Sequence, residues 1–152
     1  LSEFRKALSE IMHDLAIQIV RDGEGASKLI HIKVSGTENS SSAKKIGRSV
    51  AESPLVKPAV GASDPNWGRI IMAIGQTKET IDQKKINLKI GKNLILKNGE
   101  VSRSYSESKT KKYMQEDEIL IDINLGHGKG ESNIWTCDLT EGYIRINADY
   151  RS

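Results

Sequence analysis

Ile119-Leu120-Ile121-Asp122-Ile123-Asn124-Leu125 is the stretch that decides the fold class of this chain. Isoleucine or leucine stands at every second position, and Asp122 and Asn124 stand between them. Successive side chains of a β-strand point to opposite faces, so this period of two predicts a strand with one face in a core and one face toward water. Residues 30–35 and 86–90 alternate in the same way, which predicts a sheet built from these strands.

Two amphipathic helices are predicted beside these strands. In the first, apolar side chains recur at spacings of three and four, at Phe4, Leu8, Ile11, Met12, Leu15 and Ile19. A helix buries such a stripe, and we expect this one to pack on a sheet that includes residues 119–125. The second helix is expected over residues 42–52. Its inward side chains are Ala43, Ile46 and Val50. Pro54 ends it, because proline disfavours a helical conformation in the residue before it.

Further elements are predicted in the middle of the chain. Residues 69–74 form a short apolar run that fits a helix or a buried strand, because periodicity does not separate the two. Residues 106–115 form a highly charged segment that is a helix candidate. Asn98-Gly99 is a strong signal for a hairpin turn between two short strands.

Two final strands are predicted near the end of the chain. Residues 134–139 and 143–147 fit strands, and Thr140-Glu141-Gly142 fits a turn between them. Together the elements predict an α/β fold of the α+β type, with a mixed, mainly antiparallel sheet and helices packed on it. A length of 152 residues predicts a single domain over residues 1–152.

Composition narrows the classes of partner and compartment. The net charge of +3 and an aromatic content of 5% argue against a nucleic-acid partner. No run of 18 apolar residues occurs and the chain has no basic-then-apolar start, so we expect neither a membrane span nor a signal peptide in it. The one cysteine, Cys137, cannot form an internal disulfide. Single-cysteine usage favours a reducing compartment, and we expect a cytoplasmic protein.

General chemical motifs are few. Gly126-His127-Gly128-Lys129-Gly130 links two predicted strands, whereas a phosphate loop should open a helix, so we interpret it as a flexible turn. Three histidines and one cysteine without tight pairing give no zinc site, and we expect no metal. Cys137 lies near Trp135 on an apolar strand, which favours a buried, inert thiol over a nucleophile. No Gly-x-Ser-x-Gly nucleophile elbow occurs.

Arg21-Asp22-Gly23-Glu24-Gly25-Ala26-Ser27-Lys28 connects the first helix to the first strand. Glycine lacks a Cβ, so the two glycines beside Glu24 let the backbone take unusual conformations and let another group approach closely. One interpretation is a carboxylate held in place for a ligand. The other is a solvated connector, in which Gly23 is the residue just past the helix end.

The same segment resembles a hallmark segment of the ornithine acetyltransferase, or glutamate N-acetyltransferase, family of arginine biosynthesis. Four further segments resemble the family in the same order along the chain: Ser53-Pro54-Leu55-Val56-Lys57, Asp64-Pro65-Asn66-Trp67-Gly68-Arg69-Ile70, Trp135-Thr136-Cys137-Asp138-Leu139-Thr140, and Ile146-Asn147-Ala148-Asp149-Tyr150-Arg151-Ser152. The resemblance covers nearly the whole chain, and the Asp-Pro-Asn-Trp-Gly-Arg segment is rarely met elsewhere.

The resemblance implies a self-cleaving enzyme with a threonine nucleophile. A precursor of this family cleaves itself before a threonine into an α chain and a β chain, and an α2β2 heterotetramer is implied. The new N-terminal threonine takes acetyl from N-acetylornithine and passes it to glutamate, and its own amino group can act as the base. No metal and no cofactor are implied, although some members accept acetyl-CoA as an alternative donor.

No Ala-Thr-Met-Leu cleavage segment occurs in this sequence. The resemblance therefore implies that the nucleophile and the oxyanion-hole groups lie outside this chain, and that it holds no catalytic residue. We expect the chain to be the C-terminal part of a β chain, inactive by itself. Two alternatives stay open: a non-catalytic assembly module of the enzyme, and a fragment of a related self-cleaving amidohydrolase or aminopeptidase.

Three substrate-binding residues are implied by the resemblance: Glu24, Asn147 and Ser152. A carboxylate at Glu24 can bind the substrate's ammonium, and an amide and a hydroxyl can donate to its α-carboxylate. The alternative for Asn147 is a turn or strand-end residue, and for Ser152 a frayed terminus. Four further residues are expected to be structural: Asp64, Asn66, Trp67 and Arg69. We expect a tight turn in which the Trp67 ring buries area and the Arg69 guanidinium binds either backbone carbonyls or Asp64.

Overall fold

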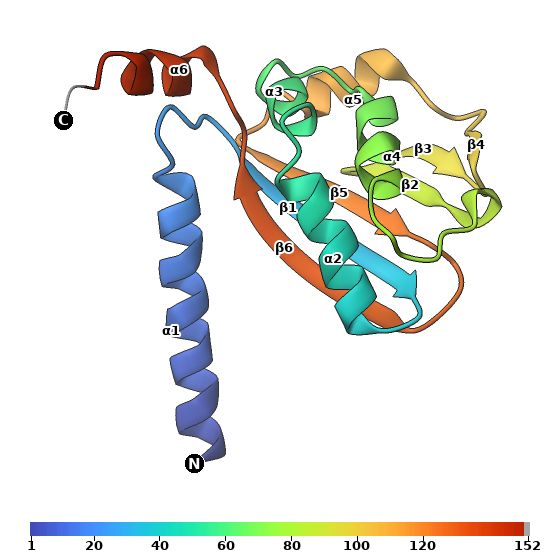
Figure 1. Cartoon of the computed structure of the whole chain (residues 1–152), viewed down its shortest axis with the longest axis horizontal. Helices are drawn as coiled ribbons and strands as arrows, with labels where there is room; N and C mark the ends of the chain where they lie inside the picture. Colours follow the sequence, from blue (N-terminus) through green and yellow to red (C-terminus); the bar gives the residue numbers. More distant parts are fainter. Residues whose placement is uncertain (151–152) are drawn as a thin grey trace.

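A six-stranded sheet forms the body of the computed structural model, which describes residues 1–150 (Figure 1). The strands run in the order β4-β3-β2-β5-β1-β6. Their bounds are β1 Leu29–Thr37, β2 Asn87–Ile90, β3 Asn93–Lys97, β4 Glu100–Val101, β5 Glu118–Asn124 and β6 Gly130–Cys137. The pair β1–β5 is parallel, and the other neighbouring pairs are antiparallel. The expected mixed, mainly antiparallel sheet is thereby confirmed.

Some of the helices cover one face of this sheet. The α-helices are α1 Ser2–Arg21, α2 Ser40–Ala51, α3 Val56–Gly61, α4 Trp67–Gly75, α5 Glu107–Tyr113 and α6 Glu141–Ala148, and a short 3-10 helix, η1, spans Gln83–Lys85. The predicted helices over residues 42–52 and 106–115 are confirmed as α2 and α5. The ambiguous run at residues 69–74 belongs to a helix, α4. None of the helices within residues 1–150 is long and apolar enough to cross a membrane.

The core lies between the inward face of the sheet and helices α2 and α4. Every second residue of β1 and β5 is buried, and these residues meet apolar side chains of the two helices: Ile30, Ile32, Val34, Ile119, Ile121, Ile123, Ala43, Ile46, Val50, Ile70, Ala73 and Ile74. The alternation in residues 119–125 and 30–35 therefore predicts the buried face correctly. At the hairpin, Asn98 and Gly99 take positive φ values of 52° and 76°, as the sequence predicts for the turn between β3 and β4.

The packing expected for the first helix is wrong. The helix exists as α1, but it extends away from the sheet, and Leu15 is 53% exposed and Ile19 75% exposed (Figure 1). Ile17 and Val20, on another face of the helix, are the half-buried residues, and His13 contacts Trp135 of β6. A periodic stripe shows that one face of a helix is apolar, but it does not identify what covers that face.

The last predicted strand is also wrong, because residues 143–147 belong to helix α6. The hydroxyl of Thr140 accepts a hydrogen bond from the amide of Gly142 and caps this helix. Strand-like composition in a five-residue segment is weak evidence when no neighbouring strand pairs with it, and helix capping decides the structure here. The strand predicted over residues 134–139 is real and belongs to β6, Gly130–Cys137.

Candidate functional site

Glu24 lies on a tight turn between α1 and β1. Helix α1 ends at Arg21, and Gly23 follows its capping residue, as the connector interpretation predicts. The amide of Ala26 donates to the carbonyl of Gly23 at 2.9 Å, which closes the turn around Glu24. Gly25 takes a φ of +69°, a conformation that side chains with a Cβ rarely adopt. The backbone therefore places the Glu24 carboxylate at the exposed tip of the turn.

The structure brings two of the three implied substrate-binding residues together. The side-chain amide of Asn147, on α6, donates a hydrogen bond of 2.7 Å to the Glu24 carboxylate. The same amide donates to the carbonyl of Tyr143 one helical turn earlier, at 2.9 Å. Both side chains are exposed, so the pair lies open at the surface of this chain. Ser152 lies outside the described residues.

Lys28 anchors the other end of the Glu24 turn to the body of the protein. Its ammonium donates to the carbonyl of Val60 at 2.9 Å, to the hydroxyl of Ser63 at 2.6 Å and to the carbonyl of Met114 at 2.6 Å. Burial lowers the pKa of Lys28 below its usual 10.5, and the nearby carboxylates of Asp138 and Asp117 partly oppose this effect. The three acceptors use all three donors of the ammonium, so Lys28 serves the fold.

The Asp64–Ile70 segment is structural in the way the sequence predicts. The Asn66 amide donates to the Asp64 carboxylate at 3.2 Å, at the start of α4. The Arg69 guanidinium donates to the carbonyl of Leu55 at 3.0 Å, and Trp67 packs against the core. These contacts join α4 to the segment before α3, so they position the helical layer.

Cys137 is half-buried, where a buried thiol was predicted. Its sulfur lies 4.0 Å from the Lys57 ammonium, which also donates to the hydroxyl of Thr136 at 3.3 Å. Gly126 has a φ of +68°, and its segment is the predicted turn between two strands. Within residues 1–150, no three His, Cys, Asp or Glu side chains gather closely enough to hold a metal ion.

An aromatic cluster joins α1 to the sheet, and the sequence gives no signal for it. The imidazole of His31 stacks on the indole of Trp135, with ring centroids 4.6 Å apart and planes at 10°. The His13 ring meets the same indole edge-on at 4.6 Å. His31 on β1 and Trp135 on β6 are register partners. Predicting this cluster requires the pairing of these two strands and the position of α1, and the sequence alone gives neither.

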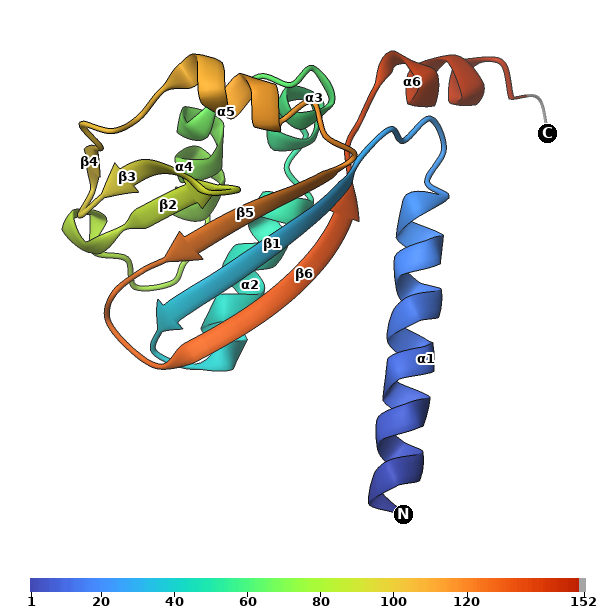
Figure 2. The same ribbon diagram turned by 180° about the vertical axis from the view of Figure 1, so that it is seen from behind.

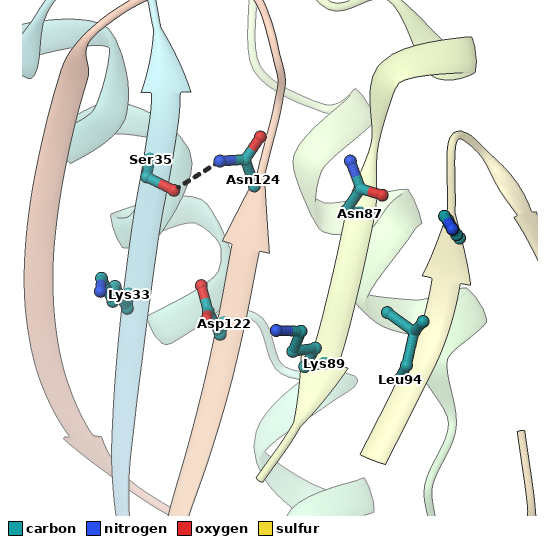
Figure 3. Close-up of a pocket in the computed structure, with 8 residues that line it drawn as sticks. Lys33, Ser35, Asn87, Lys89, Leu94, Asp122 and Asn124 are labelled. Carbon is teal, nitrogen blue, oxygen red and sulfur yellow. Dashed lines mark hydrogen bonds between the residues drawn. The ribbon is translucent and has the colours of Figure 1, made fainter. Parts of the chain in front are cut away.

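The second face of the sheet is open (Figure 2). A hollow of about 460 Å³ lies on this face, where polar side chains of β1, β2, β3 and β5 gather (Figure 3). Lys33 and Lys89 are the register partners of Asp122 on either side, and Asn124 donates to the hydroxyl of Ser35 at 3.0 Å. Neither Glu24 nor Asn147 lines this hollow, so it is separate from the Glu24–Asn147 pair.

The family that the sequence segments resemble agrees with the comparisons with known proteins. The family model described as ArgJ family matches residues 1–152. The chain belongs to the ArgJ family. This result confirms the resemblance that the sequence segments indicate, because ArgJ relatives carry the arginine-biosynthesis description.

Two relatives show the extent of the similarity within the ArgJ family. The arginine biosynthesis bifunctional protein ArgJ of Agrobacterium fabrum is 47% identical over 152 residues, which is 100% of this chain and 37% of the relative. The ArgJ of Ruegeria pomeroyi is 48% identical over 151 residues, 99% of this chain and 37% of that protein. The chain thus spans a little over a third of the length of these curated relatives.

A solved ArgJ structure has the same fold. The crystal structure of the arginine biosynthesis bifunctional protein ArgJ from Bacillus halodurans matches with a TM-score of 0.94 and 43% sequence identity. The match covers 98% of this chain and 70% of that one. The sheet, the helical layer and the projecting terminal helices therefore follow the architecture of an ArgJ structure.

Proposed function

We propose that this chain forms part of an acetyltransferase that moves acetyl from N-acetylornithine to glutamate in arginine biosynthesis. The observation that carries the proposal is the 2.7 Å hydrogen bond between Glu24 and Asn147, in a chain of the ArgJ family. These two residues are 123 positions apart in the sequence, and the fold places them side by side.

The pair has the chemistry that an amino-acid substrate needs. The Glu24 carboxylate can accept hydrogen bonds from a substrate ammonium and help to deprotonate an incoming amine. Asn147 points its amide donor at the same place and can turn that donor to the substrate's α-carboxylate. Without substrate the two groups satisfy each other, and a bound amino acid would replace one hydrogen bond by charge-assisted ones. Ser152 is proposed as a third contact.

The proposed reaction has two acyl-transfer steps. A threonine hydroxyl attacks the acetyl carbonyl of N-acetylornithine, the amide C–N bond breaks, and the amine of ornithine leaves with the proton. The amine of glutamate then attacks the acetyl ester, which releases N-acetylglutamate and restores the hydroxyl. We place this threonine and its oxyanion-hole donors in parts of the enzyme outside this chain, and we propose neither a metal nor a cofactor. Acetyl-CoA is an alternative donor for the first step.

An α chain of the same precursor is the proposed partner, in an α2β2 assembly in the cytoplasm. Two features support a covering partner. The apolar stripe of α1 is exposed along the helix, at Phe4, Leu8, Ile11, Met12, Leu15 and Ile19. The Glu24–Asn147 pair is also open, although a substrate site should exclude most water from its ligand. The same stripe favours the alternative function, in which this chain mainly forms subunit contacts.

Glu24→Gln in the complete enzyme tests the proposal. Glutamine keeps the size and the hydrogen bond to Asn147 but removes the negative charge. If Glu24 binds or deprotonates the substrate amine, kcat/KM should fall by roughly 10²-fold or more. Glu131→Gln, at an exposed position of β6, is the matched control and should leave the kinetics unchanged. If Glu24→Gln leaves the kinetics of both half-reactions unchanged, Glu24 is only a structural residue of the turn.

The chain alone is expected to be inactive. Incubation of the purified 152-residue chain with N-acetylornithine and glutamate should give no acetyl transfer above the uncatalysed rate, because the nucleophile is placed elsewhere. Transfer that persists in the isolated chain, and that a substitution within the chain abolishes, contradicts this placement. If this chain is instead a non-catalytic assembly module, Glu24→Gln should leave the turnover of the complete enzyme unchanged.

A further inference from the structure

We propose that Asp138 and Thr140 are positioning residues that hold the Glu24 turn against the start of α6, so that Glu24 and Asn147 meet. The inference rests on the proposed function of that pair and extends it to two residues whose side chains form hydrogen bonds with residues 25–28 and with the start of α6. Both residues lie directly between β6 and α6, where the chain leaves the sheet.

Asp138 is the first of these two tethers. Its side chain is only 2% exposed, and its carboxylate accepts hydrogen bonds from the amide of Ser27 at 2.8 Å and the amide of Lys28 at 3.0 Å. The hydroxyl of Ser27 donates to the second carboxylate oxygen. A buried carboxylate is costly without such partners, and here all three donors belong to the end of the Glu24 turn. Asp138 therefore fixes the turn at its strand side.

Thr140 is the second tether, and it joins both elements through one oxygen. Its hydroxyl donates to the carbonyl of Gly25 and accepts from the amide of Gly142 at 3.1 Å, which caps α6. The two glycines pack so closely that a Cβ added to Gly25 would lie 2.6 Å from the Gly142 carbonyl carbon. The Glu24 turn and α6 therefore meet along their backbones.

Besides the two tethers, the turn is held by its own backbone hydrogen bond from Ala26 to Gly23 and, at its end, by the Lys28 ammonium. None of residues 23–28 is buried, so no apolar side chain of the turn anchors it in the core. Glu24 lies between the Thr140 tether at Gly25 and the end of α1, whose apolar stripe is itself exposed. Asn147 lies two helical turns after the cap. The Lys28 ammonium binds Val60, Ser63 and Met114, so the 2.7 Å contact between the two side chains depends on the tethers that join the turn to the start of α6.

A double-mutant cycle in the complete enzyme separates positioning from general structural support. Asp138→Ala removes both oxygens that accept hydrogen bonds from Ser27 and Lys28, and Thr140→Val removes the hydroxyl. Each should lower kcat/KM by roughly 10- to 10²-fold while Glu24 is present, the cost of a misplacement of about 1 Å. In a Glu24→Gln background the same changes should lower it less than about twofold, because coupled residues are not additive.

Two further variants serve as controls. Thr140→Ser keeps the hydroxyl and should restore kcat/KM to within about twofold of the parent enzyme, since the hydrogen bonds survive. Thr37→Val removes another buried hydroxyl, whose hydrogen bond of 2.8 Å to the Asn39 carbonyl lies at the opposite end of β1. It should leave the kinetics unchanged in both backgrounds. Equal losses from Asp138→Ala with and without Glu24 would overturn the inference.

Amide hydrogen exchange supplies a readout that does not need activity. Residues 24–28 should exchange faster in the complete enzyme with Asp138→Ala than in the parent, whereas Thr37→Val should leave their exchange unchanged. Unchanged exchange at residues 24–28 in Asp138→Ala overturns the inference. If the parent enzyme transfers no acetyl group, the proposed function fails, and the exchange measurement still decides whether Asp138 holds the turn.

Discussion

Gly25→Ala tests whether the backbone contact between the Glu24 turn and α6 sets the Glu24–Asn147 distance. The φ of +69° at Gly25 is a left-handed conformation that costs an alanine about 1–2 kcal/mol. The added Cβ would lie 2.3 Å from the Tyr143 amide nitrogen, whereas ordinary contact begins at 3.4 Å. The turn and α6 must therefore separate by about 1 Å, which lengthens a 2.7 Å hydrogen bond beyond its useful range.

The expected result is a large loss of activity with a modest loss of stability. A misplacement of about 1 Å predicts a fall in kcat/KM of roughly 10²-fold in the complete enzyme. The free energy of unfolding should fall by about 1–3 kcal/mol, because the backbone strain is local and the core residues do not move. Urea unfolding of the 152-residue chain and steady-state kinetics of the complete enzyme measure the two quantities.

Gly75→Ala is the matched control for this substitution. Gly75 is the last residue of α4, it has a helical conformation, and no heavy atom lies within 4 Å of an added Cβ. Alanine there should leave kcat/KM unchanged and raise the stability by up to about 1 kcal/mol. The reasoning is refuted if Gly25→Ala behaves like Gly75→Ala, with native kinetics and no loss of stability.

Three further predictions concern the fold. Leu15→Ala should cost less than about 0.5 kcal/mol in the isolated chain because the side chain is exposed, whereas Ile121→Ala, in the core, should cost about 2–5 kcal/mol in urea unfolding. Lys28→Met should cost roughly 1.5–3 kcal/mol, since three hydrogen bonds donated by the ammonium are lost. A smaller loss would show that water takes the place of the ammonium at these three acceptors. The hydrogen bond from Lys45 lowers the pKa of Glu79 below its usual 4.5, so the stability it contributes is present above pH 4.5 and lost as pH falls through the lowered pKa. Glu79→Gln should therefore lose less stability on acidification, as thermal melts on either side of pH 4.5 can measure.

The sheet could be predicted from the sequence because its signal is local and regular. Alternation over residues 119–125 and 30–35 reports which side chains face the core, since the period of a strand does not depend on its neighbours. Strand order does not follow from the same pattern. The parallel pairing of β1 with β5 joins register partners 89 positions apart, such as Leu29 and Glu118, and no local pattern reports a pairing at that distance.

The two failures of prediction occur at the two ends of the chain. For α1, the period of the apolar stripe is predicted correctly, but the stripe does not pack on the sheet. The side of the helix that meets β6 includes His13 and Ile17 instead. For residues 143–147, the sequence composition fits either a strand or a helix, and the Thr140 cap decides the helix. In both places the deciding information lies outside the periodic segment itself.

The candidate site shows the same division between local and long-range information. The glycines beside Glu24 indicate a shaped turn, but nothing in a pattern indicates that Asn147 would reach it. The resemblance to the family names both residues, and the structure adds the contact between them. Ser152, the third implied contact, lies outside the described residues, so its role stays a prediction.

The exposed stripe of α1 and the Glu24–Asn147 pair lie on the same side of the sheet, and in the proposed enzyme this placement would link assembly to activity. Helix α6 lies near the C-terminal end of α1, away from the layer of α2 and α4 (Figures 1 and 2). The core is complete without either helix, because none of the residues in α1 or α6 is buried. The six large apolar side chains exposed on α1 do not contribute to the core, and exposed apolar surface of this kind lowers solubility. A partner that covers this stripe would also approach the Glu24–Asn147 pair and exclude water from it, so that assembly would complete the substrate site.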